Sequence, residues 1–76
     1  NQAIIFTATK RQADVLGEKL AESGHQTDAL HGDMNQRQRT RTINRLRKNE
    51  IKVLVATDVA ARGIDVQTIS HVINFD

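Results

Sequence analysis

Three short runs of apolar, β-favouring residues constrain the fold more than any other feature of this chain. They occupy residues 3–6, 53–56 and 71–75, and the first two show no alternation of apolar and polar residues. Strands buried on both faces of a parallel sheet have this pattern, whereas half-exposed strands alternate. Residues 27–31 are a weaker strand candidate. The sequence therefore predicts a sheet of four strands.

Amphipathic segments separate these runs. Residues 10–23 carry apolar side chains at helical spacing, with Thr9 as the expected N-cap and Gly24 as the expected stop. A second helix is expected over residues 36–49, capped by Asn35. Alternating strands and helices predict right-handed βαβ units, hence an α/β fold with a mostly parallel sheet and flanking helices. Because no covering helix follows the last strand, we expect residues 1–76 to form part of a larger domain.

Charge is distributed unevenly along the chain. The formal net charge is +2, but residues 37–48 contain six Lys/Arg and no acid, which leaves five Lys/Arg against nine Asp/Glu elsewhere. Such a concentrated basic segment indicates a polyanionic partner, although a solvated helix face gives the same pattern. With only two aromatic residues in the chain, we do not expect base stacking to dominate binding.

Composition also limits the class of protein. The sequence contains no cysteine, no histidine spacing typical of a metal site and no apolar run long enough to span a bilayer. We therefore expect a cytoplasmic protein without a membrane partner.

Polar sequence follows each of the first three predicted strands. Ligands of open parallel sheets bind beyond the carboxyl ends of the strands, so these segments should meet at one edge. Hydroxyl and guanidinium groups bind phosphate, glycine allows close backbone approach, and a carboxylate accepts from sugar hydroxyls. The residues assigned to these roles are Thr7, Thr57, Gly32, Gly63, Arg39 and Asp65.

Several polar residues have structural alternatives that the sequence leaves open. Thr7 and Thr9 could serve only to cap the first helix, and Asp58 could cap a short helix after it. Asp33 could belong to a turn or place a negative charge at the start of the second helix. His31 could be either structural or a ligand-binding residue.

Four stretches of the chain match one known pattern in order. They are residues 4–10 (IIFTATK), residues 31–34 (HGDM) followed by Gln36 and Arg39, residues 55–65 (VATDVAARGID) and residues 71–76 (HVINFD). Together they resemble the C-terminal RecA-like domain of DEAD-box ATP-dependent RNA helicases, over nearly the whole chain. The first three stretches resemble motif IV, the HGDM…QxxR segment and motif V of that family.

The resemblance implies roles for individual residues. The RNA sugar–phosphate backbone would be contacted by Thr7, Gly32, Arg39 and Thr57, with support from Gln36 and Asp58. Gly63 and Asp65 would contact the ATP ribose, and Arg62 would lie near the cleft between two RecA-like domains.

Other parts of a helicase are absent from this sequence. It contains no G-x-x-x-x-G-K-[ST] loop and no Asp-Glu-Ala-Asp run, so the ATP triphosphate and Mg would be held by an N-terminal RecA-like domain. The family's final arginine-rich motif is also lacking, and we expect the 76 residues alone to be catalytically inactive. Self-association through an exposed sheet edge is expected of such a fragment. A stand-alone RNA-binding module and a protein-interaction module on a helicase-like scaffold remain the alternatives.

Overall fold

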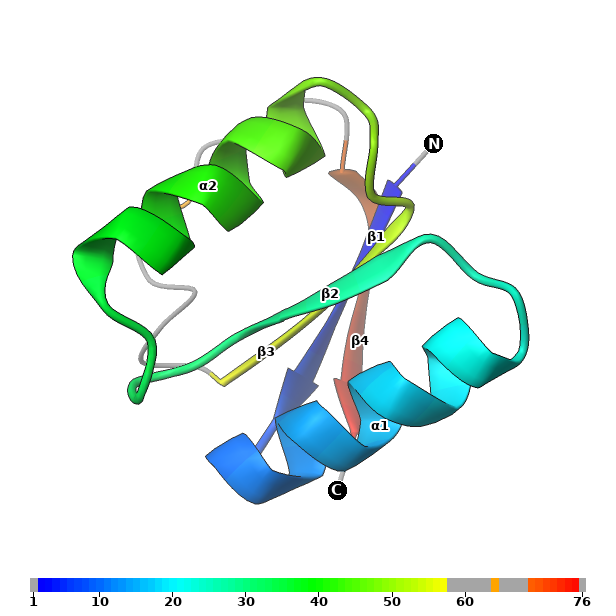
Figure 1. Ribbon diagram of the computed structural model, residues 1–76. Coiled ribbons are helices and arrows are strands. Elements are labelled where there is room, and N and C mark those ends of the chain that lie inside the picture. Colours follow the sequence, from blue (N-terminus) through cyan, green and yellow to red (C-terminus); the bar gives the residue numbers. More distant parts are fainter. Residues whose placement is uncertain (1, 58–63, 65–68, 76) are drawn as a thin grey trace.

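The computed structural model describes residues 2–57, 64 and 69–75. Strands and helices alternate along the chain and build a sheet with one helix on each side (Figure 1). The elements are β1 (Gln2–Thr7), α1 (Lys10–Glu22), β2 (Thr27–Leu30), α2 (Gln36–Arg47), β3 (Val53–Thr57) and β4 (Ile69–Phe75).

The four strands form one parallel sheet in the order β2-β3-β1-β4. The chain moves from β1 to β2 in one direction across the sheet and from β2 to β3 in the other. Right-handed connections therefore place α1 and α2 on opposite faces, as Figure 1 shows. The predicted α/β fold with a parallel sheet is confirmed, and the weak strand candidate is a true strand, β2.

The core lies mainly between the sheet and α2. Its buried residues come from every strand except β4 and from α2 and the segment after it: Ile4, Leu30, Leu46, Ile51, Leu54 and Ala56. On the opposite face, Ala13 and Gly17 of α1 are buried, and an added Cβ at Gly17 would lie 3.8 Å from the Cβ of Ala29. Small residues therefore let α1 approach the sheet closely.

The burial of the polar residue Gln2 was not anticipated from the sequence. The side chain of Gln2 is 1% exposed, and its amide nitrogen donates to the carbonyl oxygens of Leu46 at 2.6 Å and Ile51 at 2.7 Å. The first strand thus hydrogen-bonds the end of α2 and the connection to β3, which satisfies buried backbone acceptors.

Both helices have well-defined ends. Thr9 and Asn35 are the N-caps, and each forms a reciprocal capping box, so both predicted caps are confirmed. Gly24, at φ 90°, follows α1 in the left-handed conformation, as predicted. The predicted end of the second helix was two residues late: α2 ends at Arg47, and Asn49 at φ 63° turns the chain.

Among the described strands, β4 lies at one edge of the sheet. It begins two residues earlier than predicted, and its apolar side chains Val72, Ile73 and Phe75 are 63%, 48% and 44% exposed. Phe75 also lines a groove of about 210 Å³ beside α1. Neither helix of the described residues is long and apolar enough to cross a membrane.

Candidate nucleic-acid interface

The carboxyl ends of β1, β2 and β3 lie side by side, as the sequence predicted. Thr7 and Thr57 are register partners at the ends of β1 and β3, and Leu30 at the end of β2 pairs with Ala56. The segment after β2 leads directly into the N-terminus of α2. The candidate hydroxyl groups, a glycine and the start of a basic helix therefore share one edge of the sheet.

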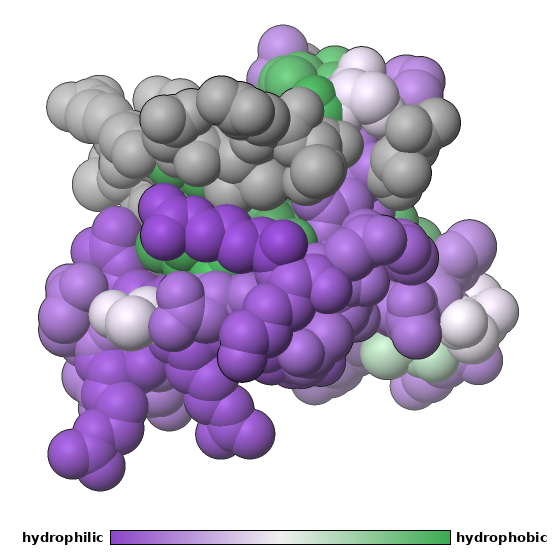
Figure 2. All heavy atoms as spheres, turned by 90° about the horizontal axis from the view of Figure 1, so that it is seen from above, coloured by the Kyte–Doolittle hydropathy of each residue, from purple (hydrophilic) through white to green (hydrophobic). Residues whose placement is uncertain are grey.

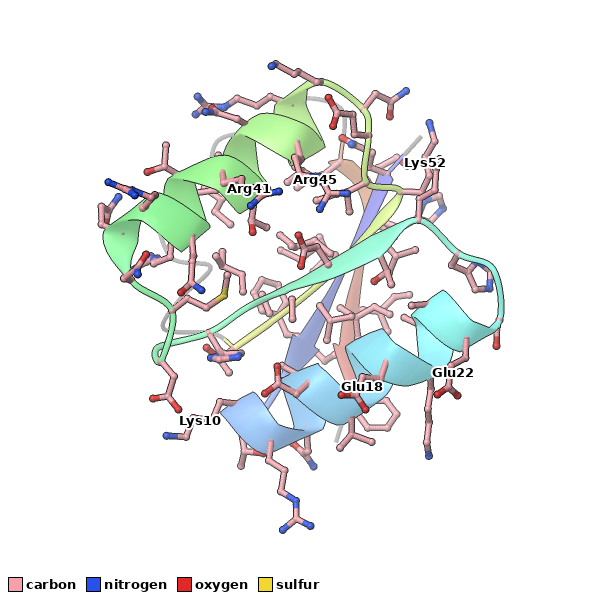
Figure 3. All side chains as sticks on the ribbon, in the orientation of Figure 1. Lys10, Glu18, Glu22, Arg41, Arg45 and Lys52 are labelled. Atoms are coloured by element: carbon pink, nitrogen blue, oxygen red, sulfur yellow. The ribbon has the colours of Figure 1, made fainter. Side chains whose placement is uncertain are left out.

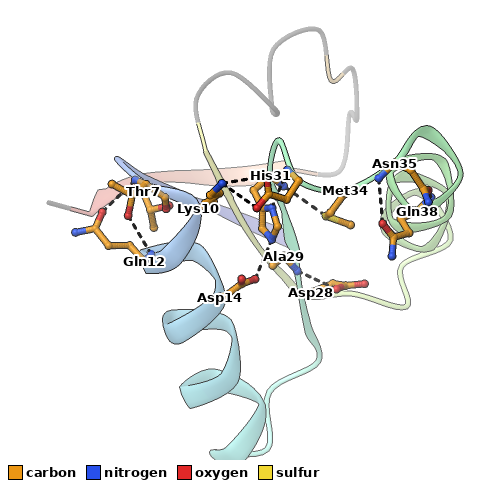
Figure 4. Close-up of polar contacts among 12 residues, drawn as sticks. Thr7, Lys10, Gln12, Asp14, Asp28, Ala29, His31, Met34, Asn35 and Gln38 are labelled. Carbon is orange, nitrogen blue, oxygen red and sulfur yellow. Dashed lines mark hydrogen bonds and ion pairs between the residues drawn. The ribbon is translucent and has the colours of Figure 1, made fainter.

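The Gly32 loop, which we define as residues 31–34, is a closed turn (Figure 4). The Met34 N–H donates to the His31 carbonyl oxygen at 3.2 Å, and the His31 N–H donates to the Met34 sulfur at 3.4 Å. Met34 also packs against the core cluster. The loop is thus anchored at both of its ends, while Gly32 between them is exposed.

One ion pair and one hydrogen bond to a carboxylate join the Gly32 loop to α1. The Lys10 Nζ lies 2.9 Å from the Asp33 Oδ2, and the His31 Nε2 lies 3.0 Å from the Asp14 Oδ1. The hydrogen bond and charge of Lys10 hold the pKa of Asp33 below its ordinary value of 3.8. Of the alternatives left open, His31 and Asp33 therefore both have structural contacts. Sequence reasoning missed these pairs because their partners are 17 and 23 residues apart.

No feature of the described residues explains why position 32 is glycine. An added Cβ would have no heavy atom within 4 Å, and the backbone of Gly32 does not lie in the positive-φ region that side chains avoid. Gly24 differs, because its φ of 90° provides a structural reason. An open site of this kind leaves room for a ligand to approach the Gly32 backbone.

The candidate threonines are less exposed than the loop. Thr7 is only 4% exposed, and its hydroxyl donates to the Thr9 carbonyl oxygen at 3.0 Å. This contact is structural, but it is not the helix cap considered for Thr7, because Thr9 is the N-cap. Its proton is thus already used within the turn. Thr57 is partly buried at the end of β3. The RNA contacts assigned to both residues stay predictions.

The arginines of α2 fall into two groups. Arg45, labelled in Figure 3, is used within the fold, because its Nη1 lies 2.9 Å from the Oδ2 of Asp28 on β2. Arg37, Arg41 and Arg47 are exposed, and Arg39 is half-buried near the N-terminus. Figure 2 views the molecule from above relative to Figure 1 and shows a largely hydrophilic surface over the described residues.

The remaining candidates complete the site only partly. Gln36 is the first residue of α2, is exposed, and donates to the Thr40 hydroxyl at 3.3 Å. The other four assigned residues lie outside the described residues: Asp58, Arg62, Gly63 and Asp65. Within the described residues, no group of three or more His, Cys, Asp or Glu side chains could hold a metal ion.

The structure defines the class of parallel α/β domains, in which ligands bind beyond the carboxyl ends of the strands. The particular family follows from comparison with known proteins. The sequence model of the family described as helicase conserved C-terminal domain matches residues 1–76, so the chain belongs to this family.

Individual relatives are DEAD-box proteins. The RNA helicase CrhR of Synechocystis is 53% identical over 74 residues, which cover 97% of this chain and 15% of CrhR. The DEAD-box ATP-dependent RNA helicase RhpA of Helicobacter pylori is 50% identical with the same coverage. The chain thus spans about a seventh of the length of these relatives.

Solved structures agree with this assignment. The E. coli DEAD-box protein SrmB, bound to regulator of ribonuclease activity A, superposes with a TM-score of 0.92 at 44% identity, over 99% of this chain and 44% of SrmB. S. cerevisiae Dbp5, bound to RNA and ADP BeF3, superposes with a TM-score of 0.89 at 47% identity, over 100% of this chain and 19% of Dbp5. The chain has the fold of the RecA-like C-terminal domain of DEAD-box proteins, as the sequence motifs indicated, and it covers 42% of the solved C-terminal domain of Dbp5.

Proposed function

We propose that this domain binds the sugar–phosphate backbone of single-stranded RNA, without reading its sequence, at the edge formed by β1, β2 and β3. The supporting observation is the convergence of three strand ends with the N-terminus of the arginine-rich α2. Backbone N–H groups at a helix start and a nearby guanidinium favour phosphate. The relatives are named RNA helicases, and Dbp5 was solved with RNA.

Within this proposal, each described residue has a limited role. Gly32 lets a phosphate or ribose approach the backbone, and Arg39 pairs with a phosphate oxygen. Gln36 supports the surface from the first turn of α2, and Thr57 contributes from the end of β3. Thr7 contributes through its hydroxyl oxygen as an acceptor, since its proton is donated to Thr9.

We further propose that the domain works as one half of an ATP-dependent RNA helicase. Asp65 and Gly63 would contact the ATP ribose, with Arg62 beside the cleft and Asp58 supporting the RNA surface. The triphosphate and Mg would be held by the N-terminal RecA-like domain, because this sequence contains no loop suited to them. This part of the proposal rests on the motif resemblance.

The RNA proposal is tested by comparing Arg39→Ala with Arg47→Ala. Both variants remove one positive charge from α2, but Arg47 lies in the last turn, about 12 Å from Arg39 along the axis. NMR titration of the labelled chain with uridine and mixed-sequence decamers gives the affinities. We expect Arg39→Ala to lower the affinity for both RNAs by the same factor and Arg47→Ala to change either affinity little.

Salt dependence provides a second readout. Neutralising about three phosphates of single-stranded RNA gives a slope of roughly −2 for log affinity against log salt, and loss of one contact reduces it by about 0.7. A loss confined to one sequence in Arg39→Ala would show base reading and contradict the proposal. No RNA binding by the unmodified chain would favour the protein-interaction alternative, in which α2 binds an acidic partner.

Catalysis and self-association have separate tests. We expect the 76-residue chain to hydrolyse no ATP, even with RNA present, and RNA-stimulated turnover by the purified chain would disprove this.

Self-association is expected through β4, whose apolar residues are exposed. Light scattering over a concentration series measures it, with Ile73→Lys as the variant that should restore a monomer.

A further inference from the structure

Side chains fasten the Gly32 loop to α1. Within the described residues, the loop meets α1 through the pairs His31–Asp14 and Lys10–Asp33. His31 is the inner member of this arrangement, since its side chain is 12% exposed, whereas Asp14 is 57% exposed. One surface carboxylate thus contacts a largely buried ring that belongs to the loop (Figure 4).

The two hydrogen bonds of His31 determine its tautomer. The Asp33 N–H points at the His31 Nδ1 at 3.3 Å, so Nδ1 must accept. In the neutral ring the proton then resides on Nε2, which donates to the Asp14 carboxylate at 3.0 Å. Asp14 therefore selects the form of the ring that can also accept from the backbone beside Gly32.

We infer that Asp14 is a positioning residue for RNA binding, which acts through His31 to hold the Gly32 backbone in its binding orientation. The inference rests on the proposed RNA function. Gly32 is exposed and has no side chain of its own to anchor it, so its backbone is held through its flanking residues, which include His31 and Asp33. A loop that is ordered before binding loses less conformational entropy when RNA arrives.

Charge alone predicts the opposite effect of removing Asp14. Loss of a carboxylate near a polyanion-binding edge reduces repulsion and should tighten binding. Loss of a positioning residue should weaken binding, because only the fraction of molecules with an ordered loop binds well. The direction of the change in RNA affinity therefore separates the two effects.

Glu18 provides a matched control. It lies one turn further along α1, is exposed, and makes no ion pair with another described residue. Replacing Glu18 by alanine removes the same charge from the same helix but leaves the His31 contact in place. Replacing Asp14 by asparagine removes the charge but keeps an oxygen that accepts from the His31 Nε2.

The experiment measures two quantities for Asp14→Ala, Asp14→Asn and Glu18→Ala in the full chain. Amide hydrogen exchange of Gly32 and Asp33 without RNA reports loop order. The dissociation constant for a uridine decamer at fixed salt reports binding. We expect Asp14→Ala to speed exchange and weaken binding about threefold to tenfold, the loss of one modest hydrogen bond. Asp14→Asn should recover most of both losses, and Glu18→Ala should bind as tightly as the unmodified chain or tighter.

The outcomes distinguish this inference from the proposed function. If the unmodified chain binds RNA and Asp14→Ala binds as Glu18→Ala does, the positioning role is wrong and the proposed function stands. Failure of Asp14→Asn to recover binding also overturns it, because the accepting oxygen is then irrelevant. If the unmodified chain does not bind RNA, the proposed function fails and the positioning role fails with it.

Discussion

Replacement of Gln2 by methionine should strongly destabilise the domain. The change keeps the length of the side chain but removes the amide group that donates to the carbonyl oxygens of Leu46 and Ile51. At about 1 kcal/mol for each lost hydrogen bond, and more if a buried acceptor stays unpaired, the loss is about 2–4 kcal/mol. A chain of this length has a total stability of only about 4–11 kcal/mol.

Urea denaturation followed by circular dichroism measures this loss, and the midpoint of thermal unfolding should fall by at least about 8 °C. Gln26→Met is the matched control, because Gln26 is exposed and should change stability by less than about 0.5 kcal/mol. Gln2→Glu should destabilise the domain more than Gln2→Met at neutral pH, because it places a buried carboxylate against two carbonyl oxygens. Equal stability of Gln2→Met and the unmodified chain would refute the reasoning.

Four further changes test the loop and the helices. Gly32→Ala should leave unfolding free energy unchanged and weaken RNA binding, since the added Cβ meets no described atom; unchanged binding in an RNA titration would contradict close approach. Gly24→Ala should lower the free energy of unfolding by about 1 kcal/mol in urea denaturation, because the φ of residue 24 is 90° and alanine avoids this conformation. Gly17→Ala should raise the free energy of unfolding by about 0.5–1 kcal/mol through helix propensity, since the added Cβ would lie at an ordinary 3.8 Å from the Ala29 Cβ. A lower free energy of unfolding would reveal overpacking between α1 and the sheet. Lys10→Met should raise the pKa of Asp33, measured by carboxyl NMR titration. Folding lowers the pKa of Asp33, so the ion pair contributes fully to the free energy of unfolding above pH 3.8. This contribution disappears as the pH falls through the lowered pKa. The unmodified chain and Lys10→Met should therefore become equally stable in acid.

The sheet and its polar edge were predictable because they depend on local patterns. Unbroken apolar runs indicate buried parallel strands, and parallel strands end on the same side. The caps Thr9 and Asn35 were predictable for a similar reason, since a capping box involves residues only three positions apart.

The contacts that hold the site together could not be predicted in this way. Gln2 bonds residues 44 and 49 positions away, and its side-chain type gives no sign of burial. The pairing of His31 with Asp14 depends on how α1 packs across the sheet. Arg45 resembles every other arginine of α2 in the sequence, and its contact with Asp28 depends on where β2 lies beside α2.

The strand order has a consequence for synthesis of the chain. Strands β1 and β2 emerge first, yet they are not neighbours, because β3 lies between them. Among the four described strands, neither β1 nor β2 therefore has its native partner until residues 53–57 have been synthesised, and their pairing can begin only when β3 leaves the ribosome. Until then α1 can pack only against isolated strands. We therefore expect chaperones to bind this segment while β1 and β2 are unpaired and their apolar side chains are exposed.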